Sequence, residues 1–174
     1  MTSTPKPAPR AWSIAVPDEA ALAEVAGALV ATLPTRAFVA LDGDLGAGKT
    51  TFVKAIAAAA GIDPAEVISP TFGLIHMHHG PRGRIVHADM YRLGGDAELR
   101  ETGWDDAIAG PGWTFVEWPG RIAAALPHDR LDITIHIDSE TARTLEFQSQ
   151  SAAYDAVMRA CAGGGRPIPP RSCP

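Results

Sequence analysis

Cysteine, net positive charge and long apolar runs are all scarce in this sequence. The two cysteines, Cys161 and Cys173, form neither a CxxC pair nor a histidine-spaced zinc pattern, so we expect no disulfide framework and no zinc site. The net charge of −5 excludes a globally basic surface for nucleic acid. No run approaches the ~18 apolar residues of a membrane-spanning helix, and the first ten residues lack the apolar segment of a signal peptide. We therefore expect a cytoplasmic protein.

The 174 residues are 46% hydrophobic and 20% charged, which is typical of one globular domain. Apolar segments of strand length alternate with amphipathic helical segments, and two pairs of strands follow each other closely, as in hairpins. This order predicts an α/β domain of three layers with a mixed, mostly parallel sheet. We place the domain at residues 11–150, and a C-terminal helix with a Pro/Gly-rich tail at residues 151–174.

The most informative segment runs from Gly43 to Thr50, GDLGAGKT, between a predicted strand and a predicted helix. It fits the pattern GxxxxGK[ST] of a phosphate-binding loop. Glycines let backbone N–H groups approach a phosphate chain closely, and the N-terminus of the following helix points at the same phosphates. Lys49 can reach the β- and γ-phosphates, and the Thr50 hydroxyl can bind Mg²⁺. The context therefore indicates a P-loop NTPase-type domain.

A magnesium ion beside a triphosphate usually needs a carboxylate at the end of a neighbouring strand. Glu117 ends the apolar run WTFVE, and Asp89 ends RIVHAD. Glu117 follows the better strand, so it is the first candidate for a ligand. Asp89 could instead polarise the attacking water or hold the metal through water.

Two further segments contain polar side chains without deciding the chemistry. The stretch SPTF, with Ser69 and Thr71, fits a loop that senses the γ-phosphate and an ordinary Ser-Pro turn equally well. In HMHH, His76 and His78 would share one face of a strand. Because a metal site usually needs three or four ligands, we do not expect one there.

Taken together, these motifs resemble the TsaE family of bacterial tRNA threonylcarbamoyladenosine biosynthesis proteins. The matching segments are GDLGAGKTTF, SPTF, HADMYRL, ELRETGWDDAI and FVEWPGRI, which follow one another in the family's order between Ile14 and Phe147. The resemblance implies an ATPase that uses Mg²⁺ and ATP and acts with the TsaB–TsaD complex, so that tRNA is involved only indirectly. ATP hydrolysis would support repeated rounds of modification rather than perform the transfer.

The same resemblance implies roles for individual residues. Lys49, Asp89 and Glu117 would be catalytic, and Thr50 and Glu117 would hold Mg²⁺. Ser69 and Thr71 would belong to a switch-like loop, and Trp118 would lie beside the metal-binding acid. Arg143 would lie near the nucleotide base, and the region of Asp18 and Glu19 would line the base pocket. The implied nucleotide-binding residues are Asp44, Leu45, Gly46, Ala47, Gly48, Lys49, Thr50, Thr51 and Arg143.

Two other functions remain compatible with a phosphate loop. A small-molecule kinase would need an arginine-rich lid, and the turn between Gly80 and Arg84 is too short to form one. A nucleotide-dependent binding switch would use ATP occupancy without turnover. Variants of Glu117 or Asp89 discriminate the switch from the ATPase. If they bind ATP without hydrolysing it and still sustain repeated rounds of tRNA modification, the protein is a switch.

Overall fold

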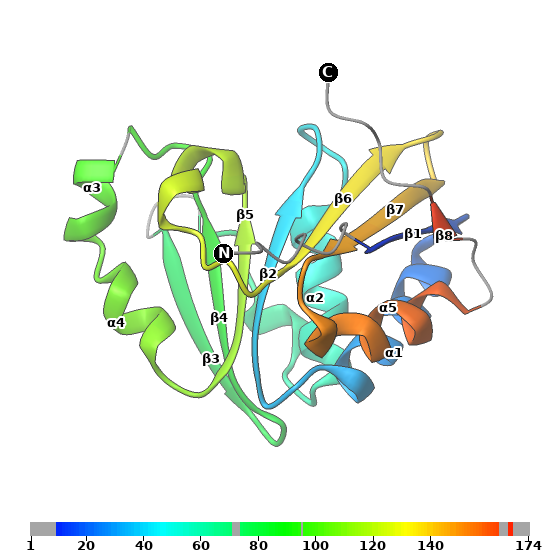
Figure 1. Cartoon of the computed structure of the whole chain (residues 1–174), viewed down its shortest axis with the longest axis horizontal. Helices are drawn as coiled ribbons and strands as arrows, with labels where there is room; N and C mark the ends of the chain where they lie inside the picture. The colour runs from blue at the N-terminus through cyan, green and yellow to red at the C-terminus, as the bar shows by residue number, and fades with distance from the viewer. Residues whose placement is uncertain (1–9, 71–73, 95, 164–166, 169–174) are drawn as a thin grey trace, which may run out of the picture.

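The computed structural model describes residues 10–70, 74–94, 96–163 and 167–168 (Figure 1). The helices are α1 (Glu19–Thr32), α2 (Lys49–Ala59), η1 (Pro64–Glu66), α3 (Asp96–Glu101), α4 (Trp104–Ala109), η2 (Pro119–Ala125), η3 (Ala152–Tyr154) and α5 (Asp155–Ala162). The strands are β1 (Arg10–Val16), β2 (Arg36–Asp42), β3 (Ile75–Gly80), β4 (Gly83–Asp89), β5 (Gly112–Glu117), β6 (Leu131–Ile137), β7 (Arg143–Ser149) and β8 (Pro167–Ile168). None of these helices combines the length and apolar character needed to cross a membrane.

The strands form one sheet in the order β3-β4-β5-β2-β6-β7-β1-β8. Among the described residues, three of the seven strand pairings are parallel and four are antiparallel. The sheet is therefore mixed, as predicted, but the expectation that it is mostly parallel is wrong. The short links between β3 and β4 and between β6 and β7 allow only antiparallel hairpins, and β1 then adds antiparallel to β7.

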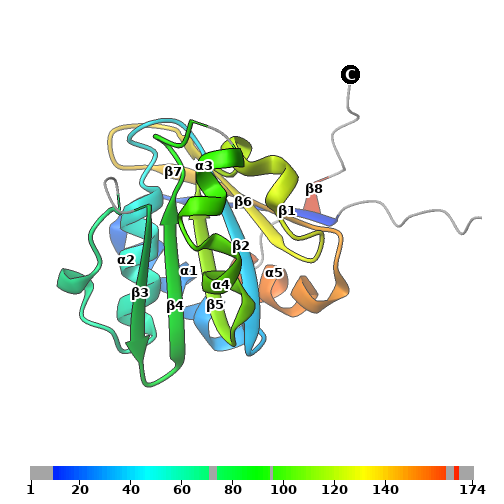
Figure 2. The same ribbon diagram turned by 90° about the vertical axis from the view of Figure 1, so that its left-hand side faces the viewer.

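Two hydrophobic clusters, one on each face of the sheet, confirm the predicted three layers. Alternate residues of β2 divide between them, since Val39 and Leu41 belong to the larger cluster and Phe38 to the smaller. The larger cluster also contains buried apolar side chains from α1, α2 and α5, and the smaller contains Leu99 of α3 and Trp104 of α4. Figure 2 shows α2 on one side of β4 and α3 and α4 on the other.

Local sequence signals explain several element boundaries. Asp18 caps α1 by accepting a hydrogen bond from the backbone N–H of Ala21 at 2.9 Å. Gly103, with a φ of 73°, separates α3 from α4, and Gly110 ends α4.

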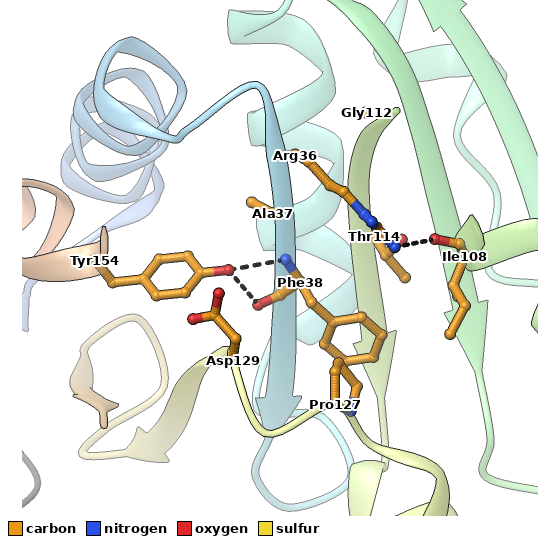
Figure 3. A pocket seen from close by; sticks show the side chains of 9 residues that line it. All are labelled: Arg36, Ala37, Phe38, Ile108, Gly112, Thr114, Pro127, Asp129 and Tyr154. Atoms are coloured by element: carbon orange, nitrogen blue, oxygen red, sulfur yellow. Dashed lines mark hydrogen bonds between the residues drawn. The ribbon is translucent and has the colours of Figure 1, made fainter. Parts of the chain in front are cut away.

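The segment after residue 150 packs onto the domain that precedes it. Val157, Met158 and Cys161 of α5 are buried in the larger cluster, and β8 pairs with β1. At the start of this segment, the Tyr154 hydroxyl accepts a hydrogen bond from Phe38 N at 3.0 Å and donates one to Phe38 O at 3.3 Å (Figure 3). Because β6 begins opposite Val39, this hydroxyl takes the place of a strand partner for Phe38.

We expect Tyr154→Phe to destabilise the protein by about 1–3 kcal/mol, because it leaves the Phe38 N–H buried without its partner. Tyr154 itself is only 2% exposed, so water cannot replace the hydroxyl freely. Urea unfolding of both proteins measures the difference. The matched control is Tyr91→Phe, which removes a hydroxyl from a tyrosine that is 41% exposed. Equal losses in the two variants would contradict a strand-capping role for Tyr154.

Candidate functional site

The carboxyl ends of three neighbouring parallel strands meet at one level of the sheet. Glu117 at the end of β5 lies opposite Leu41 of β2 on one side and Asp89 of β4 on the other. Two backbone hydrogen bonds fix this level: Trp118 N donates to Leu41 O at 3.3 Å, and Met90 N donates to Glu117 O at 3.1 Å. Ligands of α/β proteins bind at this end of the strands.

The glycine-rich segment between β2 and α2 has the backbone conformation of a phosphate-binding loop. Gly43 has a φ of 140°, and a Cβ atom there would lie 2.5 Å from the Ile135 carbonyl oxygen, so only glycine fits. Gly48 has a φ of 102° and precedes the first residue of α2. A Cβ at Gly46 or Gly48 would meet no atom within 4 Å, so these positions face open space. Backbone N–H groups of the loop and of the helix start can therefore receive an anion.

Lys49, the first residue of α2, lies folded over the loop. Its Nζ donates to Gly43 O at 2.6 Å and to Asp44 O at 2.9 Å. The same Nζ lies 3.9 Å from the centre of the Trp118 ring, a cation–π contact. Burial lowers the pKa of Lys49, while Glu117, Asp42, Asp89 and Asp44 act in the opposite direction and favour its charged form. The lysine is thus a buried cation beside several carboxylates.

Glu117 joins the start of α2 to the neighbouring strand. The Thr50 hydroxyl donates to Glu117 Oε1 at 2.8 Å and contacts Oε2 at 3.1 Å. On the other side, Nε2 of His87 lies 2.8 Å from Glu117 Oε1. Glu117 is 3% exposed. Its carboxylate and the Thr50 hydroxyl thus lie in contact where the glycine-rich loop meets α2. These are the hard oxygen donors that Mg²⁺ prefers, and they fit the predicted metal ligands.

Asp89 faces a different set of donors from Glu117. Its Oδ2 accepts a hydrogen bond from the Ser69 hydroxyl at 3.0 Å, and its Oδ1 accepts one from Tyr91 N at 3.0 Å. The structure therefore brings Ser69 of the SPTF segment to the second acid. Thr71, the other predicted switch residue, lies outside the described residues.

Arg143 lies at the start of β7, beside the phosphate loop. Its guanidinium donates to Ala47 O at 2.9 Å and to Ser139 O and Ala142 O at 2.8 Å each. It thereby ties the turn between β6 and β7 to the loop. A pocket of about 380 Å³ opens at this point, and its walls include Asp18, Glu19, Thr51 and Arg143. All the residues that the resemblance places around the base thus line one pocket.

Two residues of the site were not singled out from the sequence. His87 lies two positions before Asp89, and the period of a strand puts both side chains on one face. The Tyr91 ring lies 4.9 Å from the Trp118 ring, at an interplanar angle of 48°. Trp118 itself has a φ of 60°, in the left-handed region. The HADMYRL motif contains both missed residues, but only its acid has an obvious chemical role.

The histidines of β3 lie on the strand next to His87. His76 and His78 lie with their ring centres 6.3 Å apart. Burial, with His87 and His76, lowers the pKa of His78. Over the described ranges, no group of three or more His, Cys, Asp and Glu side chains could hold a metal ion.

A second pocket, of about 290 Å³, lies at the opposite ends of the strands (Figure 3). Arg36 and Gly112, the first residues of β2 and β5, line it together with Tyr154. Arg36 donates to Ile108 O at 3.3 Å, and Tyr154 bonds to Phe38. The Arg36 guanidinium and the Tyr154 hydroxyl therefore both have partners within the chain.

Comparison with known proteins identifies relatives over most of the chain. The family model described as threonylcarbamoyl adenosine biosynthesis protein TsaE matches residues 16–145. The TsaE protein of Rickettsia bellii is 35% identical over 125 residues, which are 72% of this chain and 86% of the relative. That of Bacillus subtilis is 37% identical over 117 residues, 67% of this chain and 72% of the relative. The crystal structure of Bacillus subtilis YdiB superposes with a TM-score of 0.71 at 26% identity, covering 90% of this chain and 97% of YdiB.

Proposed function

The chain belongs to the TsaE family, and we propose that it is a magnesium-dependent ATPase of tRNA threonylcarbamoyladenosine biosynthesis, acting in the cytoplasm. The observation that carries the ATPase proposal is the contact of 2.8 Å between Thr50 and Glu117 at the mouth of the phosphate loop. It places an acid of β5 against the first turn of α2, where the glycine-rich backbone is open to an anion.

In this proposal the chain binds ATP through the loop backbone and Lys49. The ammonium group exchanges its bonds to Gly43 O and Asp44 O for phosphate oxygens and neutralises charge that develops on them. Thr50 and Glu117 hold Mg²⁺, which supplies further charge neutralisation at the phosphates when bound. The pocket that Asp18 and Arg143 line receives the base.

Asp89 orients the attacking water in this scheme. Its carboxylate accepts hydrogen bonds from Ser69 and Tyr91 N, which hold it at the level of Glu117. The carboxylate oxygens have further lone pairs, which can accept a hydrogen bond from water. Arg143 is engaged with backbone carbonyls of the loop and of the β6–β7 turn, so we do not assign it to the transferring phosphate.

The partner that we propose is the TsaB–TsaD complex, which the family resemblance implies. The loop tip offers it an apolar contact, since Leu45 is 75% exposed. Tyr91, which is 41% exposed, packs against Trp118 with its ring tilted by 48°, at the same end of the sheet. A partner seated there would contact the residues that change when ATP is bound or hydrolysed.

Multiple-turnover tRNA modification by TsaB–TsaD tests the proposal. We expect repeated rounds only when this protein and ATP are both present, with inorganic phosphate released in step. A modification yield that does not depend on this protein would contradict the assigned role. Transfer of phosphate to a small-molecule acceptor faster than its release to water would favour a kinase instead.

A further inference from the structure

His87 is the one buried histidine that contacts the proposed metal-binding acid. It is 0% exposed, and its Nε2 lies 2.8 Å from Glu117 Oε1. In the register of the sheet it lies between His76 of β3 and Phe115 of β5. The contact between Nε2 and Oε1 shows that the ring is directed at the last residue of β5.

The chemistry of the pair fixes which nitrogen carries the hydrogen. A carboxylate must be deprotonated to bind a metal, and it then only accepts hydrogen bonds, so a metal-binding Glu117 requires Nε2 to be the donor. Nδ1 then carries a lone pair in the neutral ring, and within the described part of the chain it has no hydrogen-bond partner. In many metal sites a histidine ligand donates a hydrogen bond to an outer carboxylate, which orients it. Here the carboxylate would be the metal ligand and the histidine the outer group that donates.

The two oxygens of Glu117 are not equally engaged. Oε1 receives contacts of 2.8 Å from both Thr50 and His87, whereas the one hydrogen-bond contact of Oε2 with the described residues is the longer one of 3.1 Å with Thr50. Since Oε1 is occupied from both sides, the lone pairs of Oε2 remain for a cation. The orientation of this carboxylate thus depends on a donor from β4 as well as on the phosphate loop.

We propose that His87 is a positioning residue that donates its Nε2–H to Glu117 and so directs the carboxylate toward Mg²⁺. This inference rests on the proposed function, because it assigns a task to His87 only if Glu117 binds the metal. His87 acts through Glu117 and touches neither ATP nor water in this role. Removing such an outer partner typically lowers metal affinity by about 10- to 100-fold.

Magnesium titrations in the presence of a fluorescent ATP analogue test the proposal. We expect His87→Leu to raise the half-saturating Mg²⁺ concentration by about 10- to 100-fold, with little change in nucleotide affinity in EDTA. His87→Gln, which keeps an N–H donor of similar reach, should restore most of the metal affinity. His79→Leu is the control, since it removes an exposed histidine ring of β3 that lies opposite Arg84 rather than His87, and it should match the wild type.

An unchanged Mg²⁺ requirement in His87→Leu, or no recovery in His87→Gln, would overturn the proposal while leaving the ATPase assignment intact. A wild-type protein that binds no nucleotide, or binds it without any effect of Mg²⁺, would overturn both. If His87→Leu does not fold, ¹⁵N NMR of the wild-type histidine rings gives the decision. The proposal requires His87 to be the Nε2–H tautomer, and a hydrogen on Nδ1 with none on Nε2 would refute it.

Discussion

Lys49→Ala is expected to weaken ATP binding by about two orders of magnitude, because a hydrogen bond between charged groups contributes up to about 3 kcal/mol. The loss should be this large because Lys49 is 5% exposed and lies against the loop that would receive the phosphates. Water cannot readily take the place of its ammonium group there. Equilibrium binding of a fluorescent ATP analogue, with and without Mg²⁺, measures the change.

Lys54→Ala provides the control for this experiment. Lys54 lies on the same helix, α2, but is exposed. Its removal changes the net charge equally without touching the loop, so we expect nearly wild-type binding. Parallel losses in both variants would show that the protein attracts ATP through overall charge, which would contradict a phosphate-binding role for Lys49. Thermal unfolding of both variants separates lost binding from lost structure.

The conformation of the glycine-rich loop could be predicted from the sequence because it depends on consecutive residues. Gly43 and Gly48 favour a particular backbone conformation, and Lys49 supplies a positive charge beside it. The structure has positive φ angles at both glycines and begins α2 at Lys49. Asp89 and Glu117 could be predicted as acids at strand ends for a similar reason, since each closes an apolar run. Their placement side by side follows once both strands are parallel.

The remaining features depend on contacts between residues far apart in the sequence. The hydroxyl of Tyr154 bonds to the backbone of Phe38, 116 positions away. No local sequence pattern predicts that a side chain takes the hydrogen-bonding place of a neighbouring strand. Arg143 donates to Ala47 O, 96 positions away. This bond could not be predicted without knowing where the β6–β7 hairpin and the loop lie relative to each other. The prediction of a mostly parallel sheet was wrong because local strand patterns do not show which strands β1 and β7 pair with, or in which direction.

Asp89→Asn is expected to bind ATP nearly as well as the wild type and to hydrolyse it about 10²- to 10⁴-fold more slowly, the usual contribution of a group that orients and deprotonates the attacking water. The amide keeps the size of the acid: its one carbonyl oxygen can still accept the hydrogen bond from Tyr91 N, and its NH2 group can donate to the Ser69 hydroxyl oxygen. The amide lacks the negative charge that attracts the proton of the attacking water. Phosphate release under single-turnover conditions measures the loss.

Glu117→Gln should behave differently because its acid contacts Thr50 and His87 rather than Ser69. We expect a higher Mg²⁺ requirement for ATP binding, whereas Asp89→Asn should keep the wild-type requirement. Identical metal dependence in the two variants would contradict this division of roles. The same pair decides between turnover and occupancy: if Asp89→Asn binds ATP without hydrolysing it and still sustains repeated rounds of tRNA modification with TsaB–TsaD, hydrolysis is incidental and the protein is a binding switch. If modification instead stops after one round, ATP hydrolysis resets the complex.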